Sequence, residues 1–439
     1  MKNICCTLLC VASLAAASSE VQAADISLDS STLLGIARRD ISGAAKETLL
    51  PATQFLGLDA DKLADGNLSL HFYGWGRADL RDKSYNNDTL NGSLTYGYLQ
   101  YRFKDANADI RAGRLFVREG IVNEQVDGLS AHSDLPLGFG LSAFGGATVH
   151  TTHLFGENSD GKGDGIFGGR ANYRYKGLLE LGASAVYESK ATALLNHVNG
   201  NHRLAGGDVW FTPHKMIEVI GHSSYNIETK QMAEHSYLLN VKPIKDLVLS
   251  GEFNEQRSLS YLNASAMFTS LPSFNPSEKS RSLGGSASYQ LTKVVGLVAD
   301  YKHYTRDLGN ADRYGANAKL SFMDNTVRSG IGYHYLRAGR GFAITGTPSA
   351  SYHELRGYLM RDSKTYFAAL DLLGYFFKEK IFNEKTAWEG TASLGYHLTP
   401  ALALSGDVSY GRNPEFSEEF KGLLRLTYAM TFEGKGGKK

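Results

Sequence analysis

The chain has 439 residues with 46 basic and 45 acidic side chains, so its formal net charge is +1, which argues against a dedicated nucleic-acid binder. The mean hydropathy is −0.26, and beyond the N-terminal segment there is no run of about 18 apolar residues, which excludes membrane-spanning helices. Tyrosine (24) is abundant and proline (9) is scarce, a balance that favours a large all-β protein.

Residues 1–23 have the pattern of an export signal, with Lys2 at its start, an apolar middle and a small-x-small end at Val21-Gln22-Ala23. Cleavage is therefore predicted between Ala23 and Ala24. The cysteines of the chain all fall in this signal: Cys5, Cys6 and Cys10. The mature chain is expected to lack disulfides, thiolate metal sites and covalently attached haem, and we predict no cofactor and no metal.

Residues 24–66 have apolar residues spaced closer to a helical period than to strict alternation, in Ser31–Asp40 and Glu47–Leu63. This spacing predicts a partly helical N-terminal extension. Such an extension would plug the barrel proposed below or dock a periplasmic partner; a loose periplasmic segment is the alternative.

From residue 67 onward the dominant pattern has a period of two. In Leu68–Arg81 the even-numbered residues are Leu, Phe, Gly and Ala, and the odd-numbered ones are Ser, His, Tyr, Trp, Arg and Asp. About twenty such segments follow one another, each of about 10 residues, which is the length a tilted strand needs to cross a bilayer. The alternation therefore predicts an all-β fold for residues 67–432, namely a closed antiparallel transmembrane β-barrel of about 20 strands (18–22). Residues 433–439 are predicted to form a polar periplasmic tail. A soluble sandwich or propeller is less favoured, because the apolar faces mix Leu with Ala and Gly and end in aromatic residues.

The connections between these segments alternate between short and long, as expected for tight periplasmic turns and long outer loops. The short ones include Lys104–Ala108, Tyr175–Leu178, Thr212–Met216, Met323–Thr326, Arg361–Thr365 and Leu398–Leu402; the long ones include Thr151–Asp164, Glu255–Ser280, Arg337–Ser351 and Gly411–Phe420.

On these features the chain resembles Gram-negative outer-membrane β-barrels of the porin type over residues 68–432. The last segment, Gly422–Phe432, is similar to the C-terminal strand read by the barrel-insertion machinery, although Glu433–Lys439 follow its aromatic residue. The resemblance implies location in the cell outer membrane, with outer-membrane lipid and the insertion machinery as partners.

A barrel of about twenty strands is too wide for its own side chains to fill, so we predict a channel that passes small solutes or ions through a charged aqueous lumen. Alternation points charged residues inward, basic in early strands and acidic in later ones. The basic set is Arg77, Arg81, Arg102, Arg111, Arg170 and Arg174, and the acidic set is Glu252, Asp300, Asp371, Glu389 and Asp407. Two facing walls of opposite charge would orient dipolar solutes; pairing of each charge with a neighbour is the alternative. The extension and Glu255–Ser280 are the candidates for narrowing the pore.

Other classes of function are less favoured. As a porin–cytochrome conduit, the barrel would sheathe a multihaem c-type cytochrome and carry electrons across the outer membrane; its cysteine-free mature chain and N-terminal extension are compatible with that role. No nucleophile and base are singled out, so the chain is not expected to be an enzyme. Glu157, Asp160 and Asp164 are read as a solvated loop tip in preference to a calcium site.

Overall fold

The computed structural model describes residues 25–41, 47–81, 90–153, 156–158, 165–189, 201–257, 279–306, 309–339, 351–414 and 416–433. The predicted signal with its cleavage site at Ala23 and Ala24, the acidic tip Glu157–Asp164 and nearly all of the predicted tail lie outside the residues whose side chains are described. Within the described ranges no helix is long and apolar enough to cross a bilayer.

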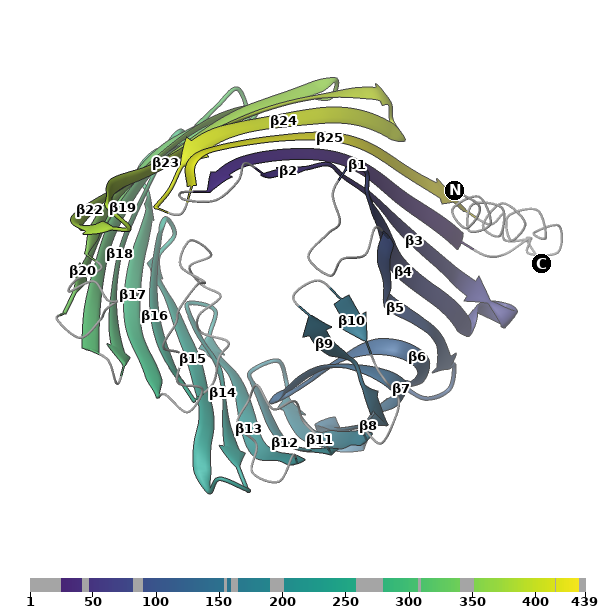
Figure 1. Ribbon diagram of the computed structural model, residues 1–439. Coiled ribbons are helices and arrows are strands. Elements are labelled where there is room, and N and C mark those ends of the chain that lie inside the picture. The colour runs from purple at the N-terminus through teal and green to yellow at the C-terminus, as the bar shows by residue number, and fades with distance from the viewer. Residues whose placement is uncertain are drawn as a thin grey trace.

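Twenty-two antiparallel strands form one closed barrel (Figure 1). Each strand pairs with the next, and the first pairs with the last from Ile26 opposite Phe432 to Ile41 opposite Phe416. The wall strands are β1 (Asp25–Ile41), β3 (Pro51–Leu63), β4 (Leu68–Asp79), β5 (Leu90–Phe103), β6 (Ala108–Glu119), β7 (Val122–Asp134), β8 (Phe139–Thr148), β11 (Gly165–Tyr175), β12 (Leu179–Ser189), β13 (Asn201–His214), β14 (Ile217–Asn226), β15 (Gln231–Ile244), β16 (Leu247–Gln256), β17 (Ser280–Gln290), β18 (Val295–Arg306), β19 (Gly309–Phe322), β20 (Val327–Ala338), β21 (Tyr352–Asp362), β22 (Tyr366–Ile381), β23 (Glu384–Thr399), β24 (Leu402–Arg412) and β25 (Phe416–Phe432).

The predicted helical extension is wrong, and so is the count of about twenty strands. Residues 25–63 supply two further wall strands, β1 and β3, which pair along Asp25–Leu34 and Ala52–Asp61. The short β2 (Glu47–Leu49) continues the path of β3 along β1, with the break at Leu50 before Pro51, a residue that has no N–H to donate to the ladder. Because these residues build the wall, they are not a plug.

Local polarity explains why alternation failed in this region. In the register of β1 and β3, Ser30, Thr32 and Gln54 share the outward face with Leu34, whereas Phe55 faces inward. The outward polar groups satisfy one another: Thr32 Oγ1 donates to Gln54 Oε1 at 2.6 Å, and Gln54 Nε2 donates to Ser30 Oγ at 2.9 Å. The usual pattern of apolar outside and polar inside is therefore partly inverted, which hides the strand period.

The two edges of the barrel differ in their connections. Short turns close the edge at which β1 begins and β25 ends, for example at residues 104–107, 176–178, 215–216 and 400–401, and the longest connections leave the opposite edge, at 80–89, 149–164, 190–200, 257–279 and 339–351. The expected long connection at Gly411–Phe420 is wrong, because β24 ends at Arg412 and β25 begins at Phe416. In outer-membrane barrels short turns are periplasmic and long loops extracellular, and we name the two edges accordingly.

The outer face of the wall is apolar and exposed. Leu283, Leu359 and Leu394 expose 57%, 53% and 65% of their surface, and Leu283 and Leu394 each stand between an inward serine and an inward glycine. Exposure of such rows to water would be unfavourable by about 25 cal/mol for each Å² of apolar surface. Contact with lipid removes that cost, which is why the strands alternate.

We predict that Leu34→Lys destabilises the barrel by about 2–4 kcal/mol, because it places a cation on the lipid face of β1. The inward substitution Leu33→Lys is the matched control and should cost less, since its ammonium reaches the lumen. Urea unfolding of the refolded barrel in lipid vesicles measures both. Equal effects of the two substitutions would contradict the placement of β1 in the wall.

Candidate functional site: a hairpin folded into the barrel

The strand pair β6–β7 leaves the wall partway along its length. Pairing of β6 with β5 ends at Arg114, opposite Gly97, and pairing of β7 with β8 begins at Val126, opposite Thr148. Between these points β6 and β7 continue to pair with each other as far as Glu119 and Val122. Residues 115–126, which we call the inner hairpin, cross towards β12 and β13 on the inner side of the ring (Figure 1).

The inner hairpin is held by an apolar underside. Leu115, Val117, Val122 and Val126 are at most 4% exposed, and they pack on inward residues of the wall: Phe144, Ile166 and Val186. Burial of one such side chain contributes about 1.5–3 kcal/mol, so the four together anchor the hairpin firmly. At the tip the Ile121 N–H donates to Ser184 Oγ of β12 at 3.2 Å.

Glycines make the bend possible. Gly113 of β6 stands opposite Gly128 of β7, and Gly113 has φ +132°, a conformation that other residues adopt only with strain. A Cβ on Gly113 would lie 2.2 Å from the Gly97 oxygen, and one on Gly128 would lie 2.1 Å from the Gly145 oxygen. The strands can approach and turn inward only because both positions lack a side chain.

Side chains replace the ladder where the hairpin departs. Arg114 Nη1 donates to the Leu94 carbonyl of β5 at 3.0 Å, and Gln125 Nε2 donates to the Thr95 carbonyl at 2.6 Å. The Arg114 guanidinium is itself fixed by two bonds to Asp127, at 2.6 and 2.7 Å. Carbonyl groups of β5 that have lost the β6 ladder thus keep donors, as a wall in lipid requires.

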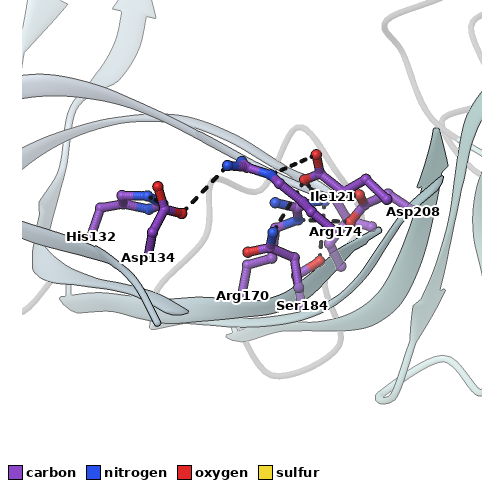
Figure 2. Close-up of polar contacts among 9 residues, drawn as sticks. Ile121, His132, Asp134, Arg170, Arg174, Ser184 and Asp208 are labelled. Carbon is purple, nitrogen blue, oxygen red and sulfur yellow. Dashed lines mark hydrogen bonds and ion pairs between the residues drawn. The ribbon is translucent and has the colours of Figure 1, made fainter. Parts of the chain in front are cut away.

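A charged cluster lies on the wall beneath the hairpin tip (Figure 2). Arg170 donates to both carboxylate oxygens of Asp208, at 3.0 and 2.5 Å, and to Glu180 at 2.8 Å. Arg174 bridges Glu180 at 2.9 Å to Asp134 at 3.4 Å. With only 11% of the Arg170 side chain exposed, the cluster stiffens the wall against which Gly120 and Ile121 rest.

A crevice of about 500 Å³ opens between the inner hairpin and the wall of β3–β8. Its polar lining combines both signs of charge: His71 lies 2.6 Å from Asp59, and the Arg111 Nε lies 3.1 Å from Asp109. The rings of Tyr96, Tyr98 and His71 line it. They belong to a row along β3–β5 with centroid separations of 5.0–6.3 Å, in the order Phe55, Tyr73, Tyr96, Tyr98 and His71. The crevice offers flat apolar faces beside paired charges.

The predicted lumen residues do not gather at one place. Arg170 and Arg174 meet through Glu180, and Arg111 lines the crevice. Arg77 lies 3.4 Å from Asp79, Arg102 stands opposite Asp109 in the β5–β6 register, and Arg81 is exposed just after β4.

Each predicted acidic residue has a basic partner on a nearby strand. The nitrogen–oxygen distances are 2.6 Å for Glu252–Lys302, 3.2 Å for Asp300–Arg313, 2.8 Å for Asp371–Arg356, 2.7 Å for Glu389–Lys421 and 3.8 Å for Asp407–Arg425. The geometry is therefore that of local pairs, the alternative to two walls of opposite charge. Among the described residues, no group of three or more His, Cys, Asp or Glu side chains is arranged to hold a metal ion.

The sequence interpretation missed the inner hairpin. The sequence does carry a sign of the inner hairpin. Leu115 and Val117 are separated from Arg111 by even numbers of residues, so they lie on the inward face of β6, which is polar elsewhere, although both are apolar. The predicted constrictions were the N-terminal segment, which is wall, and Glu255–Ser280, most of which lies outside the described residues.

Comparison with known proteins identifies the fold. No protein-family model matches the sequence, and no curated protein matches it. Among solved structures, the siderophore receptor PirA of Pseudomonas aeruginosa aligns with a TM-score of 0.57 at 11% identity, over 92% of this chain and 80% of PirA. A mutant of the ferric enterobactin receptor PfeA from the same organism aligns with a TM-score of 0.56 at 10% identity, over 91% of this chain and 80% of PfeA.

This is the fold of an outer-membrane β-barrel. The outer membrane protein OpdK of P. aeruginosa also aligns, with a TM-score of 0.43 at 12% identity, over 93% of this chain and 99% of OpdK. The closed wall with its apolar exterior places the barrel in the outer membrane. PirA and PfeA are receptors, and the cytochrome conduit receives no support from these comparisons.

We predict that Gly113→Ala destabilises the barrel by about 1–3 kcal/mol, because the new Cβ meets backbone at a strained φ. Gly76→Ala is the control, since a Cβ at Gly76 has no heavy atom within 4 Å. Both variants are unfolded in urea, and the folded fraction at each urea concentration is measured from the difference in gel mobility between folded and heat-denatured barrel. If Gly113→Ala unfolds at the same urea concentration as Gly76→Ala, the glycine pair is not needed for the bend.

Proposed function

We propose that the protein is an outer-membrane channel for small polar solutes, and that the inner hairpin with its crevice determines which solutes pass. The observation that carries this proposal is the anchoring of the inner hairpin on the inner wall by four buried side chains. A wall of 22 strands encloses more space than its own side chains fill, so a second inner layer at one place defines the narrow part of the path.

The free side of the inner hairpin supplies the groups that a passing solute meets. Phe116, Arg118 and Asn123 are exposed and alternate with the buried underside, so they point away from the wall. The Arg118 guanidinium lies 5.7 Å from the centre of the Phe116 ring. Transport would be passive, with the charge and rings of this face and of the crevice acting as the filter.

The character of the crevice supports uncharged or dipolar solutes over ions of one sign. Two of its basic groups, His71 and Arg111, each stand beside a carboxylate, Arg118 and Glu119 add one charge of each sign, and the rings of Tyr96 and Tyr98 add apolar contact. Paired charges produce strong local fields but little net potential. A solute with both a donor-rich and an acceptor-rich side would therefore fit best.

Shortening the hairpin tests the constriction. Replacing Val117–Glu124 by Asn-Gly, a favoured two-residue turn, keeps the pairing of Phe116 with Gln125. We expect a larger single-channel conductance in planar bilayers and loss of discrimination between solutes of different size. The control, Phe116→Ser with Arg118→Ser, keeps the buried underside and should alter selectivity while leaving the size limit close to wild type. Unchanged conductance of the shortened variant would refute the proposal.

Reversing the charge on the free side tests the filter. Arg118→Glu is expected to raise the permeability ratio of cations to anions, because it replaces a cation by an anion at the narrow part of the path. Arg361→Glu alters an outward residue of β21 near the periplasmic edge and should leave the ratio unchanged. Reversal potentials in a salt gradient give the ratio. The filter would be elsewhere if the two variants had the same reversal potential.

A further inference from the structure

The outer face of β16–β20 and β22 carries a group of charged side chains at the extracellular edge. The registers place Glu255 opposite Arg281, and Asp312 opposite both His303 and Arg337. Arg281 and His303 flank the exposed, lipid-facing Leu283 on the same face. We call this group, completed by two lysines, the rim cluster: Glu255, Lys279, Arg281, His303, Asp312, Arg337 and Lys378.

Two carboxylates, Glu255 and Asp312, hold basic side chains of the rim cluster in place. Glu255 accepts from Lys279 at 2.7 Å and from Arg281 at 2.7 Å. Asp312 accepts from Tyr301 at 2.8 Å and from Arg337 at 3.0 Å, and it lies 2.8 Å from His303 Nδ1. Because these contacts hold the basic side chains in place, less rotamer freedom remains to be lost when a ligand binds.

The arginines of the rim cluster are more exposed than the carboxylates that share their face. The side chains of Glu255 and Asp312 are only 11% and 13% exposed, whereas those of Arg281 and Arg337 are 48% and 65% exposed. With His303 neutral, four basic side chains stand against two carboxylates, a net charge of +2. An approaching molecule therefore meets guanidinium and ammonium donors.

The rim cluster stands directly above an aromatic belt. The rings of Tyr301 and Tyr314 are 5.3 Å apart, those of Tyr314 and Tyr335 are 6.5 Å apart, and Lys378 Nζ lies 5.3 Å from the Tyr335 ring. Aromatic belts mark the height of lipid headgroups on such barrels. The cations therefore lie at headgroup level in the outer leaflet, with apolar wall such as Leu283 and Leu355 beneath them.

We propose that the rim cluster binds the phosphate groups of an acylated, phosphorylated glycolipid of the outer leaflet. Arginine pairs bidentately with phosphate oxygens, and the acyl chains of the same molecule lie along the apolar wall below. Both halves of the ligand are thus matched by adjacent surfaces. This assignment is independent of the transport proposal, because it concerns the outer face of the wall.

The test uses the purified full-length barrel in detergent and lipid A as the probe. Native mass spectrometry and thermal unfolding are compared for lipid A with two phosphates, lipid A with its phosphates removed, and inorganic phosphate alone. We expect retention and stabilisation by the bis-phosphorylated form only. Equal stabilisation by the dephosphorylated lipid, or the same stabilisation by inorganic phosphate alone, would overturn the proposal.

Variants locate the site on the barrel. We expect the triple variant Arg281→Gln, Arg337→Gln and Lys378→Gln to have an apparent affinity for bis-phosphorylated lipid A that is lower by about tenfold or more. The reason is that hydrogen bonds from a charged donor to phosphate are stronger than those from a neutral amide. Arg281→Lys with Arg337→Lys keeps the charge and should retain most of the binding, which also shows that the site tolerates substitution. The control pair, Lys176→Gln and Arg361→Gln, removes cations at the periplasmic edge, and wild-type affinity is expected. Wild-type affinity in the triple variant would place the lipid elsewhere.

Discussion

The structure depends on one constraint, that backbone N–H and C=O groups surrounded by lipid must find partners within the protein. Only a sheet without free edges satisfies every strand at once, so the chain closes through the pairing of β1 with β25. The same constraint explains the alternation along each strand. One face contacts lipid and is apolar, and the other contacts the interior and holds charged residues such as Asp300 and Lys421 in pairs.

The inner hairpin is the place where this constraint is met by different means. Its departure removes the β6 ladder from part of β5, and Arg114 and Gln125 supply donors to Leu94 and Thr95 in compensation. Glycines at 113 and 128 allow the turn, and buried valines and a leucine hold the hairpin on the wall. The inner hairpin therefore depends on three separate local adjustments, one in hydrogen bonding, one in backbone conformation and one in packing.

Sequence reasoning reached the architecture because the strand period is a local signal. Segments such as Leu402–Arg412 show an apolar and a polar face within their own residues. The signal failed in β1 and β3, where Gln54 faces out and Phe55 faces in, and a helical spacing was read instead. The site was harder to predict, because contacts such as Ile121 with Ser184 or Arg170 with Asp208 join residues 38 or more positions apart. Alternation states which face a residue is on, but it does not state that two strands will leave the wall together.

The pairing of β1 with β25 has a consequence for how the protein is made. Ile26 and Phe432 are neighbours in the sheet although nearly the whole chain separates them, and contacts between such distant positions form late and slowly. The first strand therefore keeps one edge unpaired until the last strand is in place. The last strand, β25, is seventeen residues long, and without it hairpins can form but β1 and β24 keep unpaired edges and the ring stays open.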